Sequence, residues 1–544
     1  MWRLIDRARV GELPDRLAWL ILGFGMVVSF GLAMWFGRNS WYSVDEQVWL
    51  TESADFSLGT AFSDHYGHLV LVPRVLYKLI FATLGTGYLP FRLLSLFAIF
   101  LTVALLFVVL KRRLPAFVAL APCLVLLVFP VDPWNYLVGN GFFVLLPVAC
   151  GLAALICLER QNRTGDFAAF GLLCFGILTC TFVLPFIAGI ALVFLLTREN
   201  RHRAWIGLLP LAAYALWRLL EGVATTTAAN DGTDWVNLFQ LPVWSFQAIG
   251  AILAALAGLN FDVSTHAPYP SGGPAAPSLA ILVVGAAAWH LRKAGPSRDL
   301  WLFLAILLAL FTSQVLVSGE AGRGPAEPRY MYPGAILVVL AGAEILRGIQ
   351  WSRAGFIGIW SVCVVSLLTG GALLTRNTEW MKLWFDQARA DITAISLLES
   401  TGNPPPVSAQ PRLRALPRYS GSGAEAYGFR GWSTTDLING PAWASEQVDD
   451  FLARSRGYGL EPLPTAGTCR VATKAVDGKL PLPMAGGLIQ AAADGKVTLG
   501  RFAPTASVDL GPVRKGLTYR ITLIPDRDST RWYLTGPRLR LCAG

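Results

Sequence analysis

Two adjacent carboxylates, Asp45 and Glu46, are the residues whose type and position most directly suggest chemistry. They follow Trp41-Tyr42-Ser43-Val44, a few residues after an apolar run from Leu17 to Phe36. Because a charge inside a bilayer is costly, a carboxylate pair just past an apolar run is expected where water and a substrate both reach it. A carboxylate there can take a proton from an incoming hydroxyl. The alternative is two solvated loop carboxylates that cap a helix beginning near Gln47.

A second polar group follows in Asp64-His65-Tyr66-Gly67-His68. Two histidines three residues apart could ligate a divalent metal together with Asp45 or Asp64, although the spacing fixes no third ligand. Alternatively, the histidines hydrogen-bond a phosphate or hold Asp45 in position. The sequence leaves metal dependence open.

Arg74 and Lys78 are four residues apart in the apolar stretch 69–84, so on a helix they share one face. That face could meet an anionic headgroup. The alternative is that both cations snorkel to ordinary lipid phosphates.

A third group lies in the segment 320–330, which carries Arg323, Arg329 and Tyr330 among two glycines and two prolines. Two arginines at the mouth of a helix bundle suit bidentate binding of a phosphate. The alternative is a pair of flanking basic residues without a ligand.

A fourth group consists of Trp134, Asn135, Tyr136 and Asn140. Aromatic faces stack on a sugar ring and amides bond its hydroxyls, so these residues, with Asp64, are candidates for binding a sugar or an acceptor. An interfacial aromatic belt explains the aromatic residues equally well. The chain carries no phosphate-binding P-loop, GxSxG motif or dinucleotide fingerprint, so nothing suggests nucleotide hydrolysis.

The composition requires elements that hold these residues at a membrane. The chain has 544 residues, of which 54% are apolar and 15% charged, which predicts a polytopic α-helical membrane protein. The net charge of +10 does not indicate nucleic-acid binding, because much of the basic excess falls in short segments between apolar runs.

Eleven membrane-spanning helices are predicted. They lie near residues 17–36, 89–110, 114–130, 142–158, 167–180, 182–197, 204–220, 278–291, 300–317, 332–347 and 355–375. The break near 181 is assigned to Thr181 and Pro185, since 167–196 is too long for one straight span. Basic clusters before the first span and after every second one place the N terminus in the cytoplasm and the C terminus outside.

The predicted transmembrane domain, 1–375, therefore has four outer loops: 37–88, 131–141, 221–277 and 318–331. The apolar stretches 69–84 and 242–258 are interpreted as helices lying on, or dipping into, the outer face.

The remaining chain changes in character. Residues 376–418 are predicted to form an amphipathic helix and a Pro-rich connector, and residues 419–544 an extracytoplasmic domain. Short alternating apolar runs at about 466–544 predict a β-sandwich. Cys469 and Cys542 bracket this module and are predicted to form a disulfide, which requires an oxidising compartment.

The first span, the loop with Asp45-Glu46, the histidine stretch and Phe91-Arg92-Leu93-Leu94-Ser95-Leu96 together resemble the GT-C superfamily of integral membrane glycosyltransferases. Its relatives include protein O-mannosyltransferases, lipid A aminoarabinose transferases and actinobacterial arabinofuranosyltransferases. The resemblance covers roughly residues 1–115. The family's lysine in the histidine stretch has no clear counterpart here.

The resemblance implies an inverting enzyme that moves a sugar, arabinofuranose or mannose, from a polyprenyl phosphate to a cell-envelope glycan, glycolipid or protein. Asp45 would be the general base and Glu46 would shape the site. Charge and predicted side, rather than a matched motif, suggest the residues that bind the donor phosphate: Arg323, Arg329, Tyr330, Arg74, Lys78, His65 and His68. The β-sandwich would resemble a carbohydrate-binding module.

Two other functions fit the same residues: a lipid-linked sugar transporter or flippase, and a non-catalytic envelope assembly scaffold. A transporter should keep ionisable residues inside several spans, whereas here the charges gather at the ends. The expected location is a bacterial inner membrane, and the expected partners are the lipid-linked donor, the acceptor and membrane lipids, without nucleic acid.

Overall fold

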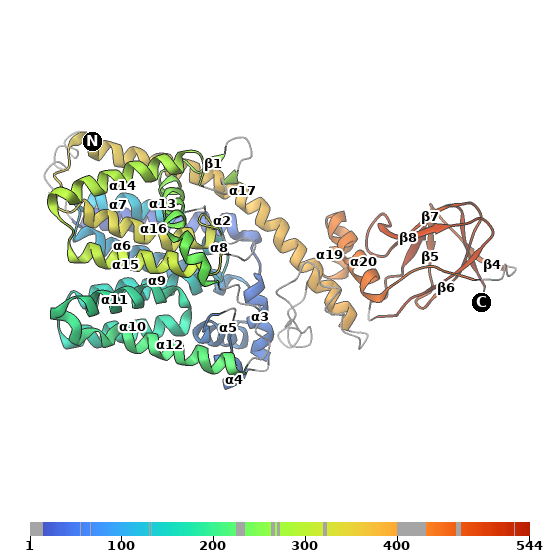
Figure 1. Cartoon of the computed structure of the whole chain (residues 1–544). Helices are drawn as coiled ribbons and strands as arrows, with labels where there is room; N and C mark the ends of the chain where they lie inside the picture. Colours follow the sequence, from blue (N-terminus) through green and yellow to red (C-terminus); the bar gives the residue numbers. More distant parts are fainter. Residues whose placement is uncertain are drawn as a thin grey trace. The chain divides into compact units, whose positions relative to one another are not determined.

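The computed structural model describes residues 15–54, 56–65, 67–129, 131, 133–224, 234–262, 267–268, 272–318, 324–399, 431–463, 469–526 and 528–543 (Figure 1). The chain forms two compact units. Unit 1 comprises residues 1–43, 56–80 and 87–381, and unit 2 comprises residues 44–55, 81–86 and 382–544.

Unit 1 is a helical bundle whose elements follow the predicted apolar runs. Its helices are α2 (Asp15–Phe36), α6 (Leu89–Lys111), α7 (Ala116–Leu127), α8 (Pro133–Leu137), α9 (Gly141–Leu158), α10 (Arg163–Thr179), α11 (Leu184–Leu196), α12 (Trp205–Ala224), α13 (Leu241–Leu256), α14 (Ala275–Ala294), α15 (Arg298–Val315) and α16 (Pro328–Ile345). The short helix α4 (Leu58–Phe62) precedes the histidine stretch, and α5 (Leu71–Leu84) follows it.

Seven helical segments in the described part of the chain are long and apolar enough to cross a membrane, as expected of a multi-pass membrane protein. They are Asp15–Asn39, Leu89–Lys111, Gly141–Leu158, Trp235–Leu256, Ala275–Lys293, Arg298–Val315 and Arg353–Leu398. Each of the eleven predicted spans falls on a helix, but α7, α10, α11, α12 and α16 are not among the seven. The count of eleven therefore stays a prediction.

Helix α13 differs from its neighbours in direction. With the 3-10 turn η4 (Trp235–Gln240) it is long and apolar enough to cross a membrane, although the sequence analysis placed 242–258 on a face. Figure 1 shows α13 lying across the direction that α14 and α15 share.

The span predicted at 355–375 and the amphipathic helix predicted at 376–398 are a single helix, α17 (Arg353–Glu399), of 47 residues. No proline interrupts this segment, so nothing in the backbone ends the helix where the composition changes. The predicted break between α10 and α11 is confirmed: α10 ends at Thr179, and the 3-10 turn η2 (Thr181–Val183) precedes α11.

Ion pairs bring the predicted basic segments to one end of unit 1. Lys111 pairs with Asp15 at 2.7 Å, and Arg113 pairs with Asp299 at 3.0 Å and with Glu344 at 2.8 Å. We call this the arginine end. The membrane side that it faces stays a prediction.

Among its described residues, unit 2 contains α3 (Val44–Ala54), the end of α5, the last part of α17, α19 (Thr434–Asn439), α20 (Ala442–Arg456) and nine short strands. The strands are β3 (Glu461–Pro462), β4 (Val471–Lys474), β5 (Lys479–Pro481), β6 (Gly486–Ala491), β7 (Gly495–Gly500), β8 (Val508–Val513), β9 (Thr518–Thr522), β10 (Tyr533–Thr535) and β11 (Leu539–Cys542).

These strands form two antiparallel sheets, ordered β5-β10-β7-β8 and β3-β9-β6-β11-β4. Alternate residues of both sheets, including Leu499 and Ile489, contribute to one hydrophobic core. The predicted disulfide between Cys469 and Cys542 is present and joins residues 73 apart in the sequence.

Candidate functional site

The histidine stretch is held by side chains from the second half of α12. The indole nitrogen of Trp217 donates a hydrogen bond to the carbonyl of Phe62 at 2.9 Å. The hydroxyl of Tyr214 donates to the carbonyl of Gly67 at 2.9 Å. The two contacts fix both ends of the segment, so α12 determines where the histidines lie.

Asp64 is the polar centre of this clamp. Its carboxylate pairs with Arg218 at 3.1 Å and accepts the backbone N–H of Gly67 at 3.0 Å. Its own backbone N–H donates to the carboxylate of Glu221 at 3.0 Å. Asp64, a predicted acceptor-binding residue, therefore stabilises the turn that carries the histidines.

The two histidines form a tight backbone bridge, with N–H to carbonyl distances of 3.1 and 3.0 Å. Gly67 lies between them with φ of 83°, a left-handed conformation that glycine adopts without steric cost. The side chain of His65 is buried, and that of His68 is half-buried.

His68 connects the stretch to two other parts of the bundle. Its Nδ1 shares a hydrogen bond with the hydroxyl of Thr181, and its ring stacks on Phe182 with centroids 6.5 Å apart. Phe182 in turn contacts the ring of Tyr330 at 6.1 Å. Two segments predicted to bind phosphate, at His68 and at Tyr330, therefore meet through η2. We call this the histidine end of unit 1.

Arg329 lies in the first turn of α16, next to Tyr330. Its side chain is exposed, pairs with Glu327 at 3.2 Å and lies 5.8 Å from the ring of Tyr330. Arg323, the other predicted arginine of this loop, lies outside the described residues.

Arg74 and Lys78 both lie on α5, which confirms the helix predicted there. Arg74 is buried and donates a hydrogen bond to the carbonyl of Ser63 at 2.7 Å. The ammonium group of Lys78 lies 4.8 Å from the ring centroid of Phe56. Arg74 therefore supports the chain that leads into the histidine stretch.

Asp45 and Glu46 lie in the first turn of α3, which begins at Val44 rather than near Gln47. Helix N-termini favour negative charge, so this position stabilises both carboxylates. Asp45 is half-buried, whereas Glu46 is fully buried. Glu46 is therefore not a solvated loop carboxylate, and α3 belongs to unit 2.

Two of the predicted sugar-binding residues take part in packing. The hydroxyl of Tyr136 donates to the carbonyl of Ser29 at 2.8 Å, and the carbonyl of Asn135 accepts from the Ser95 hydroxyl at 3.3 Å. Both side chains are buried. These contacts join α8 to α2 and α6.

The side chain of Trp134 is more exposed than those of Asn135 and Tyr136. It is half-buried and packs edge to face on Trp380, with centroids 5.9 Å apart. Asn140, just before α9, is buried.

No group of three or more His, Cys, Asp or Glu residues suited to a metal ion occurs among the residues that the structure describes. Sequence reasoning missed Phe182, Tyr214, Arg218 and Glu221, and used Thr181 only as a helix break. The two charged residues at the C-terminal end of a predicted span, Arg218 and Glu221, were the available signal.

Comparisons of this chain with protein-family models, with curated proteins and with solved structures find no match.

Proposed function

We propose that this chain is an integral membrane glycosyltransferase that moves a sugar from a polyprenyl phosphate to an acceptor hydroxyl. The observation that carries the proposal is the contact of His68 with Thr181 and, through Phe182, with Tyr330. It joins residues from three separate segments of the chain, the histidine stretch, η2 and the start of α16, at one end of a helical bundle. Several of them are donors that a phosphate diester could use.

We assign the donor phosphate to His68, Tyr330 and Arg329, with Arg323 and Lys78 as further cations. Exposed Arg329 is the best placed to meet an incoming lipid phosphate because it lies beside Tyr330. Arg74 and His65 are buried, so we assign them to positioning the loop rather than to direct binding.

In the proposed reaction the acceptor oxygen forms a bond with the anomeric carbon while the bond from that carbon to the phosphate oxygen breaks. The polyprenyl phosphate leaves with the electron pair, and the cations stabilise its charge. Asp45 is the proposed base that takes the proton of the acceptor hydroxyl, and attack of the acceptor oxygen opposite the leaving group inverts the configuration. Buried Glu46 holds the first turn of α3 and so positions its neighbour.

The finer architecture belongs to this proposal. Eleven spans, a cytoplasmic N terminus and an extracytoplasmic unit 2 would place the histidine end at the outer face of a bacterial inner membrane. The two sheets would form a β-sandwich that binds the acceptor glycan. In the described part of residues 431–543 every aromatic side chain is buried or half-buried, so acceptor binding there would use polar groups and loop backbone.

The test uses the purified chain in liposomes, with radiolabelled polyprenyl-phosphate arabinofuranose and mannose and a panel of envelope glycans. Label that moves to an acceptor supports the proposal and names the sugar. Label that crosses the bilayer without bond breaking identifies a flippase instead. If the donor binds but its label neither moves to an acceptor nor crosses the bilayer, the scaffold function is the one that remains.

A further inference from the structure

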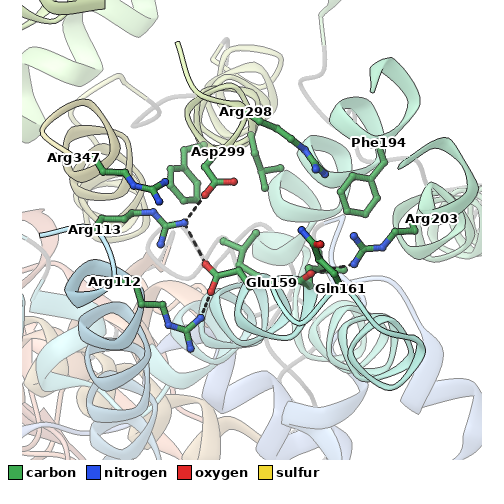
Figure 2. Close-up of a pocket in the computed structure, with 13 residues that line it drawn as sticks. Arg112, Arg113, Glu159, Gln161, Phe194, Arg203, Arg298, Asp299 and Arg347 are labelled. Carbon is green, nitrogen blue, oxygen red and sulfur yellow. Dashed lines mark hydrogen bonds and ion pairs between the residues drawn. The ribbon is translucent and has the colours of Figure 1, made fainter. Parts of the chain in front are cut away.

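The arginine end of unit 1 contains a pocket that the proposed reaction does not use (Figure 2). Its volume is about 280 Å³. It is lined by Arg112, Arg113, Arg203, Arg298 and Arg347, by Glu159, Gln161 and Asp299, and by Leu155, Leu158, Phe194, Leu302 and Phe303. Five guanidinium groups around one hollow need anions nearby.

Carboxylates account for the two arginines on the pocket floor. Arg113 is buried and pairs with Asp299 at 3.0 Å, Glu344 at 2.8 Å and Glu159 at 3.3 Å. Arg203 is buried and pairs with Asp166 at 2.5 Å. The two floor arginines therefore contact four carboxylates, two of which also pair with arginines at the rim.

The other three arginines of the lining lie at the rim and are more exposed than the two on the floor. They are Arg112, Arg298 and Arg347. Arg112 pairs with Glu159, and Arg347 lies 3.2 Å from Glu344, yet their side chains keep exposed fractions of 41% and 56%. Both carboxylates are shared with Arg113. The rim arginines therefore compete for anions that the floor already uses.

Among the residues that the structure describes, the partners of the Arg298 side chain are all neutral. Its guanidinium lies 5.7 Å from the ring centroid of Phe194, and the Asn200 amide oxygen accepts from both of its terminal nitrogens, at 2.9 and 3.0 Å. Figure 2 shows the side chain directed toward Phe194 at the pocket. An exposed arginine held in place without a carboxylate is ready to bind an anion.

This pocket is separate from the candidate glycosyl-transfer site. Helix α11 begins beside Phe182 at the histidine end and reaches Phe194 at the arginine end. The helix has 13 residues, which corresponds to a length of about 20 Å. A ligand in the pocket cannot touch both sites.

We propose that this pocket binds a phosphate group through the remaining N–H groups of the Arg298 guanidinium, with Arg112 and Arg347 at the rim. Guanidinium groups match phosphate oxygens bidentately. The volume is at the lower bound of about 300 Å³ for small-molecule sites and suits a headgroup rather than a whole lipid. The five apolar lining residues favour an anionic phospholipid, since basic pockets between membrane helices bind such headgroups.

The experiment measures binding of phosphatidylglycerol and of phosphatidylcholine to the full chain in detergent, by native mass spectrometry with varied salt. Arg298→Gln is expected to weaken phosphatidylglycerol binding about tenfold, because charge-assisted hydrogen bonds to phosphate are lost. Arg298→Lys should weaken phosphatidylglycerol binding less than Arg298→Gln does, since lysine keeps the charge but cannot bind phosphate bidentately. Arg292→Gln, which alters an exposed arginine outside the pocket lining, is the matched control.

A parallel arm titrates inorganic phosphate and glycerol phosphate against the bound lipid. If these small anions displace phosphatidylglycerol from the wild-type chain but not from Arg298→Gln, the site binds a soluble phosphate ester. Retention of lipid would assign it to the headgroup. Equal binding of both lipids by wild type, or unchanged binding by Arg298→Gln with no effect of soluble phosphate, would overturn the proposal. Because Arg298 is exposed, its replacement should leave the melting temperature unchanged, which separates loss of binding from unfolding.

Discussion

At the scale of single residues, the candidate site depends on groups whose side chains are already fixed by neighbours. His68 is held by a hydroxyl and by an aromatic ring, so its imidazole has one defined orientation. A residue that binds a ligand is most effective when its rotamer is fixed before the ligand arrives.

Replacing Thr181 with Val should therefore lower sugar transfer about tenfold without unfolding the chain, because His68 loses the hydrogen bond that orients it. Thr312→Val is the matched control, since the Thr312 hydroxyl donates a hydrogen bond to the carbonyl of Leu308 within its own helix. Initial rates at saturating donor measure the effect. Equal rates for both variants would show that the orientation of His68 does not matter.

Asp449 in unit 2 gives a prediction about pH. Burial raises its pKa to about 6, although its carboxylate accepts the backbone N–H groups of Arg501, Phe502 and Ala503. In the unfolded chain an aspartate ionises near pH 3.9, so between about pH 4 and 6 the folded state binds more protons.

This residue should therefore stabilise unit 2 as the pH falls from 7 to 5, by about 1.4 kcal/mol. Hydrogen exchange of the peptide containing residues 501–503 reports it. Asp449→Asn should remove that pH dependence, whereas Asp509→Asn, at an exposed position, should keep it. If the stability of unit 2 in Asp449→Asn still rises as the pH falls from 7 to 5, another group causes the effect.

At the scale of elements, the important device is the clamp of α12 on the histidine stretch. The sequence predicted α12 as a membrane span and the stretch as an outer loop, but not their contact. Tyr214 and Gly67 are 147 residues apart, and hydrophobic periodicity says nothing about pairs at such a distance. By contrast, each of the eleven apolar runs predicted as spans falls on a helix, because burial in a bilayer or a core leaves a continuous signal.

Arg218→Gln should loosen this clamp, since it removes the partner of Asp64 at 3.1 Å. The pair is partly exposed, so its loss should speed amide exchange in residues 62–68 only a few-fold. Hydrogen exchange of the reconstituted chain measures this. Arg201→Gln, on the other end of the bundle, serves as the control. No change in residues 62–68 would mean that the pair of Arg218 and Asp64 does not help to hold the loop.

The disulfide is the element whose prediction from sequence succeeded most directly, because the two cysteines bracket a strand-rich module. Closing a loop of 73 residues restricts the unfolded chain, so the bond should stabilise unit 2 by about 4 kcal/mol. Reduction of the full chain should lower the urea midpoint of unit 2. The double variant Cys469→Ser/Cys542→Ser should show the lower midpoint at once and no response to reductant; an equal midpoint would contradict the estimate.

At the scale of the whole molecule, two ends of one bundle carry different chemistry. The histidine end gathers an imidazole, a phenol and an exposed arginine, and the arginine end gathers five guanidinium groups around a pocket. The basic segments between predicted spans anticipated the arginine end, because their alternation places them together. They did not anticipate a pocket, since its shape depends on how Phe194 and Phe303 pack.

The central claim is that Asp45 acts as the base of a sugar transfer. The most direct test compares wild type with Asp45→Asn, measuring transfer from the accepted polyprenyl-phosphate sugar and donor binding on the same preparation. Glu379→Gln, an exposed carboxylate in α17, is the control. We predict that Asp45→Asn loses transfer by at least a hundredfold while it binds donor as wild type does, because general-base catalysis contributes about 10²–10⁴-fold. Transfer at the wild-type rate by Asp45→Asn would contradict the account and move the base to another residue.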